Sequence, residues 1–190
     1  MRVAATVVFA LMILSVYGIG ASNAQAPHIG VYFETDGWGN YSTMQKDTPA
    51  GGGLDYFYVV AMDLNVLVMG FEYSIICPGS ITYAGEAATG SINLGQSPFH
   101  LGGISIAYNL PQNGYNPVLL STVTFVWNNA DCLVLDDPIQ VTHNPNTGFI
   151  GYTDWPTFAK HPAVGMTSLL CATIPTEETT WGKVKSLYSE

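Results

Sequence analysis

Charged side chains are scarce in this chain: they make up 10% of its 190 residues, and only five residues are Lys or Arg. Globular domains usually carry about a quarter charged residues. The net charge of −9 would repel phosphate backbones and anionic lipid, which argues against nucleic-acid binding and against simple membrane adsorption. Aromatic residues reach 12%, and low charge combined with many aromatics argues against intrinsic disorder.

The short motifs of common enzyme families are also missing. The sequence contains no G-x-S-x-G, no H-E-x-x-H and no P-loop. The histidines are isolated from one another, at His28, His100, His143 and His161. No cysteine or histidine has a partner at metal-ligand spacing, and the acidic stretch Glu34–Asn40 departs from a calcium-loop pattern. We therefore expect no enzyme, no cofactor and no metal site, with a hydrolase site assembled only by folding as the alternative.

Long apolar runs are absent after the N-terminus. Arg2 precedes the apolar run Val3–Ile19, and small residues follow it up to Ala24. This is the pattern of a secretory signal peptide, so residues 1–24 are expected to be cleaved and the protein to be secreted or held at the cell surface. No later run is long enough to span a membrane, so no span is expected after processing. An uncleaved N-terminal anchor is the alternative.

Cysteine is limited to Cys77, Cys132 and Cys171. In an exported protein, three cysteines allow one disulfide and one free thiol, and three pairings can be written. Cys132 and Cys171 both close strand-like segments in the second half of the chain. We therefore favour a Cys132–Cys171 disulfide.

Period-two alternation dominates residues 25–174. The stretch Leu54–Leu64 is rich in Tyr, Phe and Val, and in Val68–Ile75 the residues Met69, Phe71, Tyr73 and Ile75 share one face. About eight or nine such segments, spaced by roughly ten residues, predict an all-β sandwich or barrel. The polar, glycine-rich stretch that begins at Glu34 predicts a long loop.

Aromatic residues recur in the segments that we expect to be loops. These residues are Trp38, Tyr41, Tyr115 and Trp155. Flat rings on loops can stack on sugar faces or anchor a protein partner, although each ring alone is more often a packing residue. They are the candidate ligand-binding residues.

The C-terminal tail, residues 175–190, differs from the rest of the chain. It has helical spacing of apolar residues, with a stripe formed by Trp181, Val184, Leu187 and Tyr188. A helix of about two turns is too short to be stable alone, so the stripe needs a surface. That surface is either the sandwich itself or a partner or export component.

Two family resemblances rest on these segments. The stretch LDYFYVVAMDLNVLVMGFEYSIICPGSI, together with VLLSTVTFVW, resembles the immunoglobulin-like domains of the cohesin type. The stretches DDPIQVTHNPNTGFIGYTDWP and PTEETTWGKVKSLY resemble a group of uncharacterised secreted bacterial proteins with a similar tail. The first resemblance implies an immunoglobulin-like (cohesin-like) β-sandwich; it does not extend to a dockerin partner, because IICPGS stands where cohesins carry an acidic turn.

The sequence therefore predicts a single secreted β-sandwich domain over residues 25–174, followed by a tail with a short C-terminal helix. The expected function is that of a non-catalytic extracellular domain for adhesion, assembly or cell-surface display, with a protein or cell-surface partner. A carbohydrate-binding module that uses the loop aromatics is the alternative. The sequence does not indicate an oligomeric state.

Overall fold

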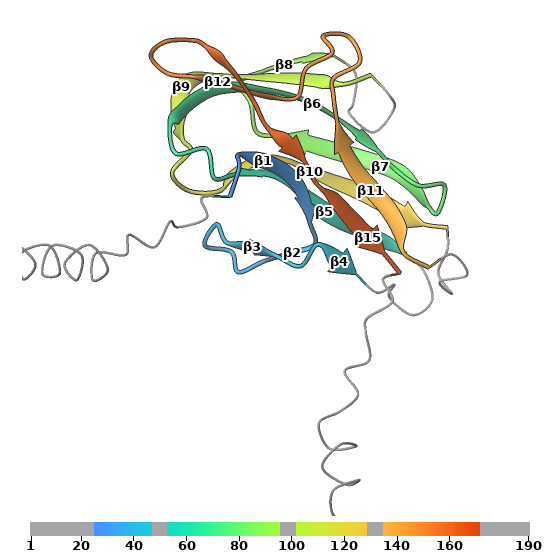
Figure 1. The fold of residues 1–190 in the computed structure, drawn as a ribbon. Coiled ribbons are helices and arrows are strands. Elements are labelled where there is room, and N and C mark those ends of the chain that lie inside the picture. The colour runs from blue at the N-terminus through green and yellow to red at the C-terminus, as the bar shows by residue number, and fades with distance from the viewer. Residues whose placement is uncertain (1–24, 47–52, 96–101, 129–134, 172–190) are drawn as a thin grey trace, which may run out of the picture.

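Two β-sheets packed face to face form the body of the molecule (Figure 1). The computed structural model describes residues 25–46, 53–95, 102–128 and 135–171. These ranges contain no α-helix and fifteen strands, more than the eight or nine expected, because several strands of only two to four residues leave no alternation to read in the sequence. The predicted all-β, immunoglobulin-like sandwich is thus confirmed.

The first sheet has five strands, with β5 near its centre. Its order is β14 (Val164–Gly165), β1 (His28–Tyr32), β5 (Leu54–Met62), β10 (Val118–Trp127) and β7 (Ile81–Ala88). All neighbours are antiparallel except β14 and β1. Along β5, Phe57 and Val59 are fully buried while Tyr56 and Tyr58 reach solvent. The alternation read from the sequence therefore separates a core face from an outer face.

The second sheet is built around the long strand β6 (Leu67–Ile76). One edge of β6 pairs with β9, which in turn pairs with β8; the other edge pairs first with β12 and then with β11. The sheet continues through β13 beside β12, and through β15 and β4 beside β11. The bounds of these strands are β4 (Gln45–Lys46), β8 (Ile92–Gly95), β9 (Ile104–Asn113), β11 (Asp137–Thr142), β12 (Gly151–Asp154), β13 (Lys160–Pro162) and β15 (Thr167–Leu170).

Aromatic side chains from both sheets fill the space between them. The rings of Phe57 and Phe125 lie 5.7 Å apart, and the rings of Phe125 and Trp127 lie 5.2 Å apart. Tyr73 crosses the core from β6, and its hydroxyl lies 3.3 Å from Ser121 Oγ on β10. A buried hydroxyl needs a hydrogen-bond partner, and Ser121 supplies one for the Tyr73 hydroxyl inside the core.

The prediction of one long loop from Glu34 to Gly53 was wrong in part. A small hairpin stands there, formed by β2 (Glu34–Thr35) and β3 (Tyr41–Ser42), and β4 follows it. Backbone bonds fix the segment: Phe33 N donates to Thr43 O, and Leu169 N donates to Met44 O. Sequence alternation missed these strands because each has only two residues.

A β-bulge interrupts the alternation predicted for β6. The pairing of β6 with β9 shifts between Val68 and Gly70, so Val68 is buried in the core while Met69 is only half-buried and faces outward. The prediction that Met69 shares a face with Phe71 was therefore wrong. A bulge adds one residue to a strand and reverses the facing of the residues before it.

Several predictions fall outside the described residues. They are the signal peptide at residues 1–24, the short helix of the tail with Trp181, Val184, Leu187 and Tyr188, and the position of Cys132. Within the described ranges, the search for a helix of sufficient length and apolarity to cross a membrane finds none.

Alkylation of thiols tests the cysteine predictions. Cys77 is free and mostly buried, and burial raises the pKa of its thiol far above the ordinary value. Because the thiolate is the reactive form, we expect no labelling of Cys77 in the folded protein and complete labelling after unfolding without reduction. Cys171 is not among the free thiols of the described residues, so peptide mapping of the same sample checks the predicted Cys132–Cys171 disulfide. Labelled Cys171 in the unreduced, unfolded chain would contradict that pairing.

Candidate functional site

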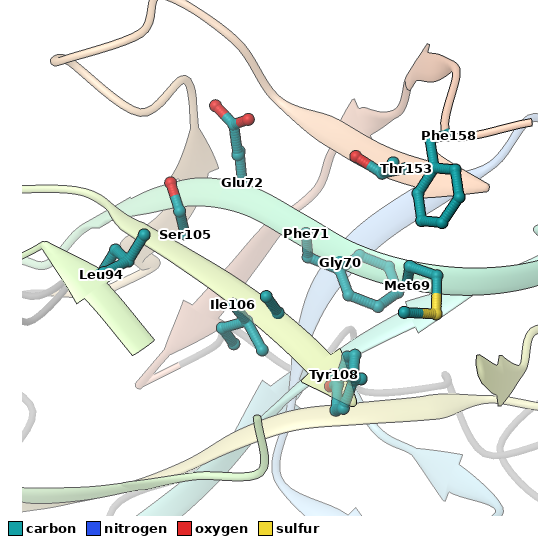
Figure 2. A pocket seen from close by; sticks show the side chains of 11 residues that line it. Met69, Gly70, Phe71, Glu72, Leu94, Ser105, Ile106, Tyr108, Thr153 and Phe158 are labelled. Carbon is teal, nitrogen blue, oxygen red and sulfur yellow. The ribbon is translucent and has the colours of Figure 1, made fainter. Parts of the chain in front are cut away.

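A shallow groove lies on the outer face of the second sheet, over β8, β9, β6 and β12 (Figure 2). Its volume is about 300 Å³. We call this surface the docking face. Besides the core residues Phe71, Ile106 and Tyr108, its lining comprises Met69, Gly70, Glu72, Leu94, Ser105, Ala107, Thr153 and Phe158.

Strand register explains why these residues meet. Ala107 of β9 stands opposite both Gly70 of β6 and Ile92 of β8, and Thr153 of β12 stands opposite Gly70 on its other side. Figure 2 shows Glu72, Ser105 and Thr153 rising from the strands on one side of the sheet. Residues from four separate segments therefore share one outward row.

The floor of the docking face is smooth because its central residues are small. A Cβ added at Gly70 would lie 2.6 Å from the backbone oxygen of Ile106, so the close approach of β6 and β9 requires glycine here. Ala107 and Ser105 add little bulk beside it. The groove thus exposes strand backbone and small side chains to whatever lies on it.

Large apolar side chains stand on both sides of this floor. Leu94 is 61% exposed and Ile92 on the same strand is also exposed, while Phe158 on the opposite side is 56% exposed. The ring of Phe158 packs edge-on against Trp155 at 5.2 Å. Contiguous exposed apolar side chains are a feature of interaction surfaces rather than of ordinary surface.

The turn between β12 and β13 holds the two aromatic rings in place. The Asp154 carboxylate accepts hydrogen bonds from Thr157 Oγ1 and from Ala159 N, and Trp155 N donates to Leu67 O at 2.9 Å. The hydrogen bond from Thr157, followed by that from Ala159, lowers the pKa of Asp154 despite some desolvation. The carboxylate is therefore ionised at neutral pH and fastens the turn.

One ion pair lies at the border of the docking face. Lys160 Nζ of β13 contacts Glu72 Oε1 of β6, and Lys160 also lies over the Phe149 ring at 5.3 Å. Burial alone would raise the pKa of Glu72, but hydrogen bonds from Lys160 and Thr147, together with the charge of Lys160, outweigh burial and lower the pKa. Each charge thus neutralises the other, which leaves the groove without an uncompensated ion from this pair.

The four loop aromatics predicted from the sequence fall into two separate pairs. Trp38 and Tyr41 belong to the β2–β3 hairpin, where Trp38 is 91% exposed at the tip. Tyr115 and Trp155 belong to two turns anchored near the start of β6. Gly114 N donates to Val66 O just before β6, and Trp155 N donates to Leu67 O, the first residue of β6. The structure does not bring all four together as one binding site.

Sequence reasoning missed the residues that form the docking face. Leu94 and Phe158 read as ordinary apolar residues of a weak strand and of a proline-rich turn. The signal that could have found Leu94 is the alternation Ile92, Leu94 in a four-residue strand whose residues are all exposed. Such a pattern indicates a strand whose apolar side faces away from the core.

The histidines do not assemble a hydrolase site in the described residues. His161 Nε2 lies 3.2 Å from Asp154 Oδ2, and the ring stacks on Tyr152 with centroids 5.2 Å apart. His143 contacts Thr142 Oγ1 at 3.4 Å. Neither histidine is hydrogen-bonded to a serine in the described ranges, so the alternative of a triad formed by folding gains no support.

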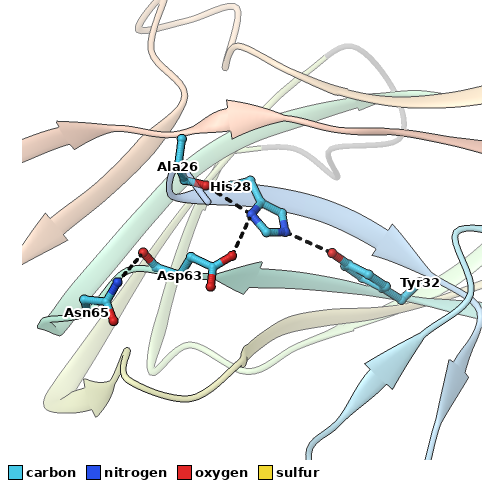
Figure 3. Close-up of polar contacts among 5 residues, drawn as sticks. All are labelled: Ala26, His28, Tyr32, Asp63 and Asn65. Atoms are coloured by element: carbon cyan, nitrogen blue, oxygen red, sulfur yellow. Dashed lines mark hydrogen bonds and ion pairs between the residues drawn. The ribbon is translucent and has the colours of Figure 1, made fainter. Parts of the chain in front are cut away.

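His28 is a structural histidine (Figure 3). It is buried on the outer face of β1, where Nδ1 lies 3.2 Å from Ala26 O and 3.3 Å from Asp63 Oδ2, and Nε2 lies 3.1 Å from the Tyr32 hydroxyl. These contacts are satisfied when Nδ1 donates and Nε2 accepts the Tyr32 proton. The cluster fastens the start of β1 to the connection that follows β5.

Metal ligation finds no support in the described ranges either. They contain no group of three His, Cys, Asp or Glu side chains placed to hold a metal ion. In the acidic Glu34–Asn40 stretch, the Asp36 carboxylate accepts hydrogen bonds from Trp38 N, Asn40 N and Asn40 Nδ2. These bonds, with that from the Asn40 side chain first, lower the pKa of Asp36. The stretch is a self-capped polar turn.

Comparisons with known proteins find similar solved structures but no matching sequence family. No family model matches the chain, and no curated protein matches it. The chain is similar in structure to the cohesin module of a family 33 glycoside hydrolase from Clostridium perfringens, at 5% identity and a TM-score of 0.47, over 77% of this chain and 98% of that one. It is similar to a non-cellulosomal cohesin from the archaeon Archaeoglobus fulgidus, at 12% identity and a TM-score of 0.46, over 87% and 99%.

A third similar structure is the sixth cohesin of scaffoldin B from Acetivibrio cellulolyticus, solved in complex with a Cel5 dockerin. Identity is 10%, the TM-score is 0.47, and coverage is 77% of this chain and 98% of that one. At TM-scores of 0.46 and 0.47 these are likenesses only, and support for a partner has to come from the surface of this chain.

Proposed function

We propose that this chain is a secreted, non-catalytic extracellular domain that binds a protein partner through the docking face, in adhesion, assembly or cell-surface display. The observation that carries the proposal is the pair of exposed apolar borders, Leu94 on one side and Phe158 on the other, around a smooth strand floor. Single exposed apolar residues are ordinary, but exposed apolar side chains gathered around one groove are typical of interaction surfaces.

The chemistry of the docking face indicates what kind of partner fits. Glu72 and Lys160 already neutralise each other, so an apolar element laid on the groove would leave no unpaired buried charge from this pair. An apolar ridge, such as the stripe of an amphipathic helix, would cover Leu94 and Phe158 together. The net charge of −9 favours a partner whose border is basic.

Site-directed binding measurements test this proposal. A photoreactive amino acid at position 94, introduced in the native host, identifies the protein that lies on the docking face, and that protein is then purified. We expect Leu94→Asp to weaken its binding by at least about tenfold, because a desolvated carboxylate would face an apolar partner. The matched control is Ala87→Asp, on the outer face of the opposite sheet beside Thr122, which we expect to leave the affinity unchanged.

Three outcomes would overturn the proposal. Equal affinities for Leu94→Asp and Ala87→Asp would place the partner elsewhere. A concentration-dependent dimer that Leu94→Asp abolishes would identify a second copy as the occupant. If a partner binds only after residues 175–190 have been deleted, the tail with Trp181 and Tyr188 is what covers the docking face in the intact chain.

A further inference from the structure

A second groove, on the outer face of the first sheet, differs in chemistry from the docking face. It lies between β5 and the β2–β3 hairpin and has a volume of about 460 Å³, within the range of small-ligand sites. We call it the tyrosine groove. Besides Phe33, its lining comprises Glu34, Thr35, Asp36, Ser42, Tyr56 and Tyr58.

Tyrosine rings form one wall of the tyrosine groove. Tyr56 and Tyr58 are successive outward residues of β5, with ring centroids 5.5 Å apart, and Tyr41 of β3 packs 5.5 Å from Tyr58. The ring planes are tilted by 58° and 70° to one another, so they do not form a flat platform. Tyr56, at the open end, is 48% exposed and offers ring surface to a ligand.

Oxygen atoms form the other wall. Thr35 and Ser42 contribute hydroxyls, and Glu34 contributes a carboxylate whose Oε2 accepts the Thr43 hydroxyl at 2.7 Å. Asp36 is held by donors of its own turn, Trp38 N at 2.7 Å and Asn40 Nδ2 at 2.6 Å. These acceptors are therefore already oriented before any ligand arrives.

Charge restricts the ligand further. The lining residues include Glu34 and Asp36 and none that is basic. Lys46 lies near Phe33, but its ammonium is paired with Asp55 at 2.6 Å. Sulfated, phosphorylated or uronic-acid ligands would meet two uncompensated carboxylates. A ligand that donates hydrogen bonds and carries no negative charge suits this wall.

We propose that the tyrosine groove binds a neutral carbohydrate, such as the terminal residues of a hexose-containing oligosaccharide. A sugar ring has an apolar C–H face, which can pack on the tyrosine wall. It also has a rim of hydroxyl donors, which can bond to the oxygen wall. The tilted rings fit one or two sugar residues rather than a long flat chain. The tyrosine groove and the docking face lie on opposite sheets, so this proposal does not depend on the protein partner.

A glycan array followed by titration calorimetry tests the proposal, with the folded protein and neutral gluco-, manno-, galacto- and N-acetylglucosamine oligosaccharides as probes. We expect weak binding of at least one series, with dissociation constants of about 0.1–10 mM for so shallow a site. Tyr56→Ala should weaken binding by at least about tenfold, whereas Tyr56→Phe should keep most of it because the ring remains.

Tyr115→Ala is the matched control, since Tyr115 is an exposed loop tyrosine outside the tyrosine groove. It should leave the dissociation constant unchanged. A loss of binding in Tyr115→Ala with none in Tyr56→Ala would overturn the assignment, as would a preference for sulfated or uronic-acid glycans. The absence of binding to every neutral series at about 10 mM would overturn it as well.

Discussion

Replacing Phe57 by alanine is expected to lower the free energy of unfolding by about 3–5 kcal/mol, the usual cost of removing a large aromatic side chain from a packed core. Phe57 is fully buried between the sheets and contacts Phe125 and Phe33 with centroids 5.7 and 6.5 Å away. The cavity left behind could not close without moving strands that are hydrogen-bonded on both sides. Urea unfolding followed by circular dichroism measures the change.

Tyr56, the preceding residue, is the control for this experiment. It points to the opposite face of β5 and is about half exposed, so Tyr56→Ala should change the free energy of unfolding by less than about 1 kcal/mol. Equal losses for Phe57→Ala and Tyr56→Ala would contradict the facing of β5. The same variant serves the carbohydrate test, because a folded Tyr56→Ala protein makes its loss of binding interpretable.

Gly70→Ala is expected to cost about 1–3 kcal/mol, the range for overpacking a close contact. The added Cβ would meet the backbone oxygen of Ile106 at 2.6 Å, and a backbone atom cannot rotate away as a side chain can. To relieve the clash, β6 and β9 must separate at the bulge, which would also deform the floor of the docking face. Unfolding measurements give the stability change, and amide exchange in β9 reports the local separation.

Gly85→Ala is the matched substitution on a strand with free space. A Cβ at this position of β7 would meet nothing within 4 Å. We therefore expect the stability to be unchanged or to rise by up to about 1 kcal/mol, because alanine restricts the unfolded chain. If Gly70→Ala proves as harmless as Gly85→Ala, the close approach of β6 and β9 is not as described.

Period-two patterning was sufficient to predict the two-layer core. In β5 and in the second half of β6, each buried aromatic alternates with a residue of the outer face. The shared face of Phe71 and Tyr73 was predicted from the sequence, whereas which face of β5 is buried was not. The bulge at Val68–Gly70 did not follow, because its cause is the approach of β9, which is distant in the sequence. Local patterns do not record which strands become neighbours.

The candidate binding surfaces were harder to predict for the same reason. Leu94 and Phe158 border one groove only because β8 and β12 lie on either side of the β9–β6 pair. Tyr58 and Tyr41 were visible as aromatics, but only Tyr41 was assigned to a loop, and the contact between their rings depends on the hairpin folding over β5. Tyr115 and Trp155 were predicted as candidate ligand-binding residues, but they lie on turns other than the β2–β3 hairpin, and Trp155 packs against Phe158 of the docking face.

Hydrogen–deuterium exchange of the domain with and without its purified protein partner tests the central claim most directly. We expect the partner to slow exchange in β8, β9 and the β12–β13 turn around Phe158, and to leave β7 and β10 unchanged. Protection confined to β7 and β10, on the outer face of the other sheet, would contradict the docking face as the surface through which this domain works.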